Sequence, residues 1–151
     1  MLLSNLILIP LIGSFLVLFI PSQYKETIKV IVLSFSLAEF LLSLMMWMSF
    51  DNSSSRFQFV EVYNWIESSN IIFYLGVDGI SLFFILLTTL LIPICLLASW
   101  DAIKFNEKEY FIAFLAMEAL VIAVFCVLDI ILFYVFFESV LIPMFIIIGV
   151  W

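Results

Sequence analysis

Three glutamates lie inside long apolar runs of the sequence: Glu39, Glu118 and Glu138. An ionisable side chain at mid-depth in a bilayer costs about 2.5–3.5 kcal/mol on insertion scales. We therefore treat each of these three glutamates as a candidate functional residue. Burial disfavours the charged form of a carboxyl, and a nearby cation favours it. A buried glutamate with a movable cationic partner can therefore take up and release a proton. The alternative for each residue is a neutral carboxyl that only forms hydrogen bonds between helices.

Glu118 and Glu138 are the most informative pair, because each lies ten residues from Leu128. The stretch 111–151 contains no Lys or Arg, and as one helix it would be about 60 Å long, twice the thickness of a bilayer. It must therefore fold back, and the turn fits at Leu128, where Asp129 can cap the next helix. At about 1.5 Å per residue, both carboxyls then lie about 15 Å from that surface, on neighbouring antiparallel helices.

Pro143 strengthens the functional interpretation of Glu138. Its ring removes a backbone N–H and leaves the carbonyl of Ser139, the residue after Glu138, without its partner within the helix. In membranes such breaks persist where water or polar neighbours satisfy the freed carbonyl. A carboxyl beside a broken turn predicts a hydrated cavity at Glu138, and the alternative is a kink that serves packing alone.

For Glu39 and Asp78, the neighbouring residues favour structural roles. Ser36 and Ser43 lie on the helical face of Glu39, so a hydrogen-bonding stripe packed against protein is the favoured interpretation, with a place in a proton path as the alternative. Asp78 opens an apolar run together with Ser81, and its carboxylate is placed to cap a helix N-terminus.

The composition places these residues in a membrane. The chain of 151 residues is 67% hydrophobic and 11% charged, whereas a soluble domain is roughly 45–50% apolar and about 25% charged. The net charge of −7 has the wrong sign for a nucleic-acid partner. The sequence has no histidine and only two isolated cysteines, so we expect no metal or redox cofactor bound by this chain.

The apolar runs predict an all-α membrane protein with about five transmembrane helices. Their expected spans are 2–20, 27–50, 79–100, 110–128 and 130–150. In the second connection, aromatic residues alternate with others over 57–65, a turn sequence follows at 67–70, and an apolar run covers 71–75. This pattern predicts a small β-hairpin over about 56–76, lying on the membrane face.

The basic residues predict the orientation. Lys25 and Lys29 flank the first connection, Lys104 and Lys108 lie in the third, and the second contains only Arg56. The excess of positive charge places the first and third connections on the cytoplasmic or matrix side. The N-terminus and the turn before the fifth helix then face the opposite side.

Two stretches resemble a known family. Residues 75–84, LGVDGISLFF, resemble the opening of the third helix in antiporter-like membrane subunits. Residues 128–144, LDIILFYVFFESVLIPM, are similar to the fifth helix of the chain 4 family of NADH–ubiquinone oxidoreductase, respiratory complex I, in its mitochondrial form. The resemblance covers essentially the whole chain.

The resemblance implies that Glu138 is the fifth-helix glutamate of a proton channel, paired in the family with a lysine on the seventh helix. Glu118 matches an acidic position found in many members. The family also implies other membrane-arm subunits as partners and the mitochondrial inner membrane as the location. The complex would use NADH, FMN, iron–sulfur clusters and ubiquinone. Because family members have more spans than five, we expect an N-terminal piece, either truncated or completed by a second chain that carries the remaining helices and the lysine.

The sequence thus predicts a membrane-arm subunit of a proton-translocating NADH:ubiquinone reductase. Such a subunit would contribute half of a proton channel, with no redox catalysis of its own. Two alternatives remain. One is a subunit of a multi-subunit Na⁺/H⁺ antiporter, which shares the motif around Asp78, and the other is a scaffold in which the glutamates only connect helices.

Overall fold

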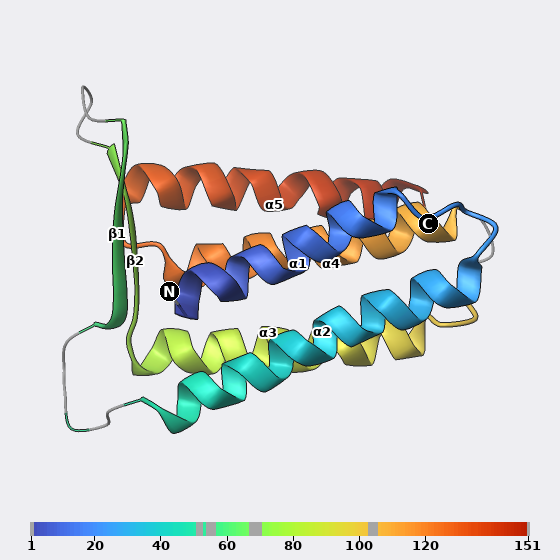
Figure 1. Ribbon diagram of the computed structural model, residues 1–151. Coiled ribbons are helices and arrows are strands. Elements are labelled where there is room, and N and C mark those ends of the chain that lie inside the picture. The colour runs from blue at the N-terminus through green and yellow to red at the C-terminus, as the bar shows by residue number, and fades with distance from the viewer. Residues whose placement is uncertain (1, 51–52, 54–56, 67–70, 103–105, 151) are drawn as a thin grey trace.

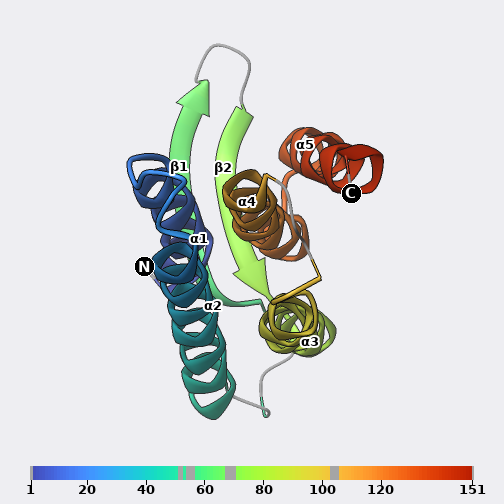
Figure 2. The same cartoon turned by 90° about the vertical axis from the view of Figure 1, so that its right-hand side faces the viewer.

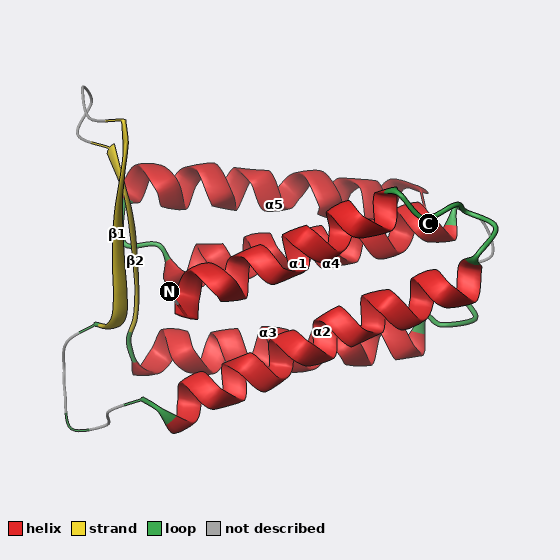
Figure 3. Cartoon of the chain, viewed as in Figure 1, coloured by secondary structure: helices red, strands yellow, loops and turns green. Residues whose placement is uncertain are grey.

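Residues 2–50, 53, 57–66, 71–102 and 106–150 are described by the computed structural model. Within them the chain forms five helices and one two-stranded antiparallel sheet (Figure 3). The elements are α1 (Leu2–Leu18), α2 (Lys25–Met48), β1 (Gln58–Ile66), β2 (Ile71–Val77), α3 (Gly79–Ala98), α4 (Glu107–Cys126) and α5 (Ile130–Val150). The predicted fold class, five helices with a hairpin in the second connection, is confirmed.

Helices α2, α3, α4 and α5 are long and apolar enough to cross a membrane, and α1 is a shorter apolar helix of 17 residues. The helix ends differ from the expected spans by a few residues. Helix α1 ends at Leu18 rather than at residue 20, because the next two N–H groups bond to carbonyls only three residues back. Helix α2 begins at Lys25 instead of residue 27, and α4 covers 107–126 instead of 110–128.

The helices run side by side, and the hairpin lies across one end of them (Figures 1 and 2). Helix α4 is central and packs against α1, α2, α3 and α5. Helix α5 packs mainly on α4 and is the least covered of the helices. Because α5 has neighbours on one side only, most of its surface is free in this chain.

The hairpin connects the start of α1 to the turn between α4 and α5. Glu61 of β1 accepts hydrogen bonds from the backbone N–H and the hydroxyl of Ser4, both at 2.9 Å. The N–H of Leu128 donates to the carbonyl of Tyr74 at 2.9 Å. We call this end of the bundle, with the N-terminus and the sheet, the hairpin end (Figure 1).

The opposite end of the bundle carries Lys25, Lys29 and Lys108, and we call it the basic end. The N-terminus, the hairpin and the α4–α5 turn all lie at the hairpin end, as the predicted orientation requires. The predicted hairpin turn at 67–70, together with Arg56 and Lys104, lies outside the described residues.

Two apolar clusters fill the interior, one near the hairpin end around Leu75 and one near the basic end around Phe111. Seven polar or charged side chains are nevertheless buried among the described residues. They are Ser14, Lys29, Ser36, Glu39, Ser43, Thr89 and Glu118. Four of these seven belong to α2, which is therefore the helix with the most polar buried face.

Candidate functional site

Glu118 lies at the middle of the central helix α4, and its side chain is 0% exposed. Neither of its carboxylate oxygens has a hydrogen-bond partner among the described residues. A buried polar group without a partner is rare in folded proteins and calls for an explanation, such as a proton-binding role. Glu118 therefore lies in protein, not in lipid.

Glu39 of α2 is equally buried, at 0% exposure, and its two oxygens also have no hydrogen-bond partner in the described part of the chain. Helices α2 and α4 are in contact, and the carboxyls of Glu39 and Glu118 are close enough to repel each other. The fold thus brings together two acids that are 79 positions apart in the sequence, a proximity that no local pattern indicated.

The hydrogen-bonding stripe predicted around Glu39 was right about the face and wrong about the bonds. Ser36 and Ser43 are buried on the same face, as predicted. The Ser36 hydroxyl donates to the carbonyl of Leu33 at 2.9 Å, and the Ser43 hydroxyl shares a 2.8 Å hydrogen bond with Thr89 of α3. Neither hydroxyl forms a hydrogen bond with the carboxyl of Glu39. The Ser36 hydroxyl bonds to a backbone carbonyl instead, and the Ser43 hydroxyl bonds to Thr89 across the α2–α3 interface.

Glu138 lies on α5 and is exposed in this chain. Its neighbours along the outward surface, Tyr134, Phe137, Leu141 and Ile142, are exposed too. Helices α4 and α5 are antiparallel neighbours joined by a tight turn, as predicted, but Glu118 faces the interior and Glu138 does not. The two acids therefore form no pair within this chain.

The residues next to Glu138 keep α5 helical. Ser139 donates from its hydroxyl to the carbonyl of Val135 at 2.7 Å. Pro143 is buried, and α5 continues past it to Val150. Pro143 lines a largely apolar groove between α4 and α5, together with Ala113 and Ala116. The hydrated cavity expected at Glu138 stays a prediction.

Two aspartates begin helices. Asp78 is the N-cap of α3 and accepts a 2.8 Å hydrogen bond from the N–H of Ser81. That hydrogen bond lowers the pKa of the Asp78 carboxyl below its ordinary value. Asp129 accepts hydrogen bonds from the N–H groups of Ile131 and Leu132, at 2.8 and 3.3 Å, and so caps α5.

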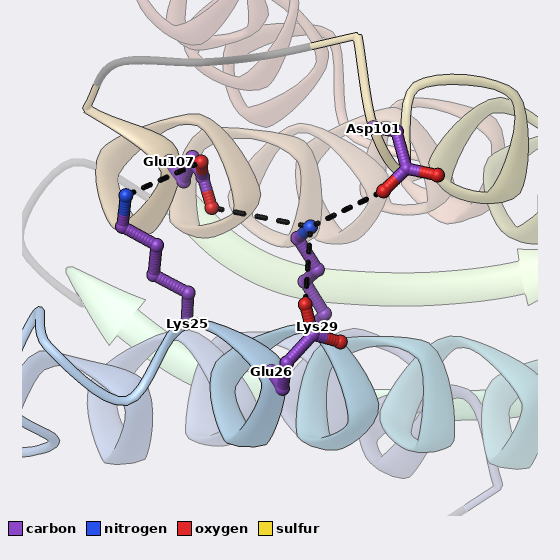
Figure 4. A network of polar contacts seen from close by, with 5 residues as sticks. All are labelled: Lys25, Glu26, Lys29, Asp101 and Glu107. Carbon is purple, nitrogen blue, oxygen red and sulfur yellow. Dashed lines mark ion pairs between the residues drawn. The ribbon is translucent and has the colours of Figure 1, made fainter.

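An ion-pair network at the basic end was missed by the sequence reasoning (Figure 4). Lys29 is only 6% exposed and lies 3.7 to 4.0 Å from the carboxylates of Glu26, Asp101 and Glu107. Lys25 also approaches Glu107, at 3.7 Å. The network joins α2 to the start of α4. The spacing of Lys25 and Lys29 on one helical face hints at such a cluster, but their partners come from other elements.

The buried carboxyls of this arrangement can hold protons. Across the ranges that the structure describes, no group of three or more His, Cys, Asp or Glu side chains is placed to bind a metal ion. Two buried, unpaired carboxyls in the bundle and one carboxyl on an uncovered helix are instead the ionisable groups that lie at membrane depth.

Comparison with known proteins identifies the family. The family model described as NADH-ubiquinone oxidoreductase chain 4, amino terminus, matches residues 4–128. The chain is 60% identical over 149 residues to NADH-ubiquinone oxidoreductase chain 4 of Arabidopsis thaliana, covering 99% of this chain and 30% of that protein. It is 40% identical over 151 residues to NADH-quinone oxidoreductase subunit M of Rickettsia prowazekii, covering 98% of this chain and 31% of that protein.

The fold also has a solved counterpart in the respiratory complex I of Thermus thermophilus with bound NADH. The TM-score is 0.77 at 24% sequence identity, over 95% of this chain and 27% of that chain. The chain thus spans less than a third of the length of the relatives that it matches. On the family match over residues 4–128 and these identities, the chain belongs to the family of NADH-ubiquinone oxidoreductase chain 4.

Proposed function

We propose that this chain is the N-terminal part of a membrane-arm subunit of respiratory complex I, a multi-pass protein of the mitochondrial inner membrane. It would contribute half of a proton channel that is coupled to electron transfer between NADH and ubiquinone. The family membership and the set of long apolar helices support this role. The names of the relatives favour it over a subunit of a multi-subunit Na⁺/H⁺ antiporter.

The observation that carries the proposal is the position of Glu138 on the least covered helix. An ionisable side chain is costly in lipid, so the surface of α5 around Glu138 needs a protein neighbour with a complementary group. The relatives have more than three times the length of this chain, which leaves room for further helices. We propose that those helices cover α5 and place a lysine opposite Glu138, either from a second chain or from a continuation of this one.

The chemistry follows from the charge of that lysine. When the ammonium group is near, it favours the carboxylate of Glu138, and the proton leaves. When the ammonium group withdraws, the neutral acid is favoured in the low-dielectric interior, and Glu138 takes up a proton. Electron transfer in other subunits would drive the alternation, and NADH, FMN, iron–sulfur clusters and ubiquinone would bind there. We assign Glu118 to the same proton-translocation machinery, because it is a buried acid on the helix that supports α5.

The test is the Glu138→Gln substitution in the intact complex, with protons pumped per NADH oxidised as the measurement. Glutamine keeps the shape of the neutral acid but cannot exchange a proton. The number of protons pumped per NADH oxidised is expected to fall, because a channel without a proton-exchanging group at this position no longer contributes its share. Glu109→Gln is the matched control, since Glu109 is an exposed acid at the basic end of α4. Unchanged pumping by an assembled Glu138→Gln complex would favour the scaffold alternative.

A further inference from the structure

Four of the seven buried residues of α2 are polar or charged, and the other three, Ile28, Val32 and Met46, are apolar. Lys29, Ser36, Glu39 and Ser43 follow one another at intervals of seven, three and four residues, and all four are buried. Such intervals place them in one line along the helix. The line begins at the ion-pair network of the basic end, where Asp101 is exposed to the surroundings, and it ends at the hydrogen bond between Ser43 and α3.

Glu39 and Glu118 interact electrostatically across the contact between α2 and α4, and neither forms an ion pair among the described residues. The nearest basic group on the buried face of α2 is Lys29, which lies about 15 Å away along the helix and is engaged by three carboxylates. Cys126 of α4 is a further titratable group that interacts with Glu39. Glu61 of β1 reaches Cys126 from the hairpin end. All of these neighbours other than Lys29 are acidic or neutral groups.

Two ionised carboxylates are not stable in this position. A buried charge is tolerated when it is paired and hydrogen-bonded, and neither condition is met by the oxygens of Glu39 and Glu118 among the described residues. Their mutual repulsion raises the cost further, as in other carboxyl pairs that share a site. The pair therefore retains at least one proton at neutral pH.

We propose that Glu39 and Glu118 together form a proton-binding site inside the bundle, where α2 packs against α4. The ligand is a proton held between two carboxyls, and Ser36 lies between the pair and Lys29. The site is separate from Glu138, and it requires neither the lysine partner nor the helices that would cover α5. It deepens the role proposed above for Glu118, and the two tests are distinguishable, because the carboxyl band of Glu39 and Glu118 can be absent while Glu138→Gln still lowers pumping.

The test is infrared spectroscopy of membranes that contain the intact complex, in H₂O and in D₂O. A protonated carboxyl has a C=O stretching band that moves when its proton is replaced by deuterium, and a carboxylate lacks this band. The variants are Glu39→Gln, Glu118→Gln and the double substitution, and Glu109→Gln is the control with an exposed carboxyl.

The expected result is a deuterium-sensitive band that the double variant lacks and the control keeps. Each single variant should retain a band at a shifted frequency, because the remaining carboxyl has lost its neighbour. The proposal is wrong if the double variant has the wild-type band, if the band does not move in D₂O, or if removing one acid leaves the band of the other unchanged. Should the double variant fail to assemble, Glu39→Asp keeps a carboxyl at a new position and must shift the band.

Discussion

Removing either partner of the buried ion pair between Lys29 and Glu107 should destabilise the packing of α2 on α4. The two groups are 6% and 12% exposed, with 4.0 Å between Nζ and the carboxylate oxygen. Coulomb's law at an effective dielectric constant near 20 gives about 4 kcal/mol at this distance, which is an upper bound because both ions lose hydration. The separation is too long for a charge-assisted hydrogen bond. We therefore expect a coupling free energy of about 2 kcal/mol, above the median for surface pairs.

The assay uses Cys126, which is fully buried on α4 and reacts with a thiol reagent when the bundle opens. Cys95 is exposed, so the measurement is made in a Cys95→Ser background. Lys29→Gln and Glu107→Gln should each raise the labelling rate about thirtyfold, which corresponds to 2 kcal/mol. The effect of the double variant should be smaller than the product of the two single effects, because the Lys29–Glu107 interaction is already lost in each single variant, while Lys25, Glu26 and Asp101 account for the remainder.

Asp101 supplies the matched comparison. It lies at the same 4.0 Å distance from Lys29 but is 94% exposed, so water and salt screen the pair. Asp101→Asn should change the labelling rate less than about fivefold, or 1 kcal/mol. If Asp101→Asn and Glu107→Gln have equal effects, burial does not decide the strength of these ion pairs, and the reasoning fails.

Three further substitutions test the hairpin end. Asp78→Ala should cost about 1 kcal/mol of stability through loss of the α3 cap, measured by chemical denaturation in detergent. Because the pKa of Asp78 is lowered in the folded chain, this contribution is complete above the ordinary value of 3.8 and disappears as the pH falls through the lowered value. Gly76→Val should cost about 1–3 kcal/mol in the same assay, because a Cβ at Gly76 would lie 2.9 Å from a methyl group of Leu128. Ser4→Ala removes one of two hydrogen bonds to Glu61 and should expose the amides of α1 to faster hydrogen exchange, by about tenfold for a loss of about 1 kcal/mol.

Local sequence signals were sufficient for the elements and their caps. Long apolar runs predicted the helices, because a helix that crosses a membrane satisfies its own backbone hydrogen bonds. The alternation over 57–65 predicted β1, because side chains on a strand alternate between two faces. Asp78 and Asp129 were recognised as caps, since an N-cap bond joins residues two or three positions apart. Each of these features depends on neighbours within one turn or one strand.

The direction in which each acid faces could not be predicted in the same way. Helices α4 and α5 are apolar on all sides, so no polar stripe indicates which face meets protein. Glu118 and Glu138 lie at equal distances from Leu128, so local sequence could not show that one is buried and the other exposed. That difference in exposure arises from tertiary packing. The approach of Glu39 to Glu118 depends on contacts between helices that are far apart in the sequence.

The buried acids and Glu138 differ in what surrounds them. Glu118 and Glu39 are enclosed by this chain's own helices, so substitutions in those helices can alter their proton chemistry. Glu138 is exposed on α5, so its charge state depends on whatever group approaches that surface in the assembled protein. Substitutions in α2 should therefore change the Glu39–Glu118 pair and leave Glu138 unaffected, whereas substitutions on the exposed surface of α5 should do the reverse.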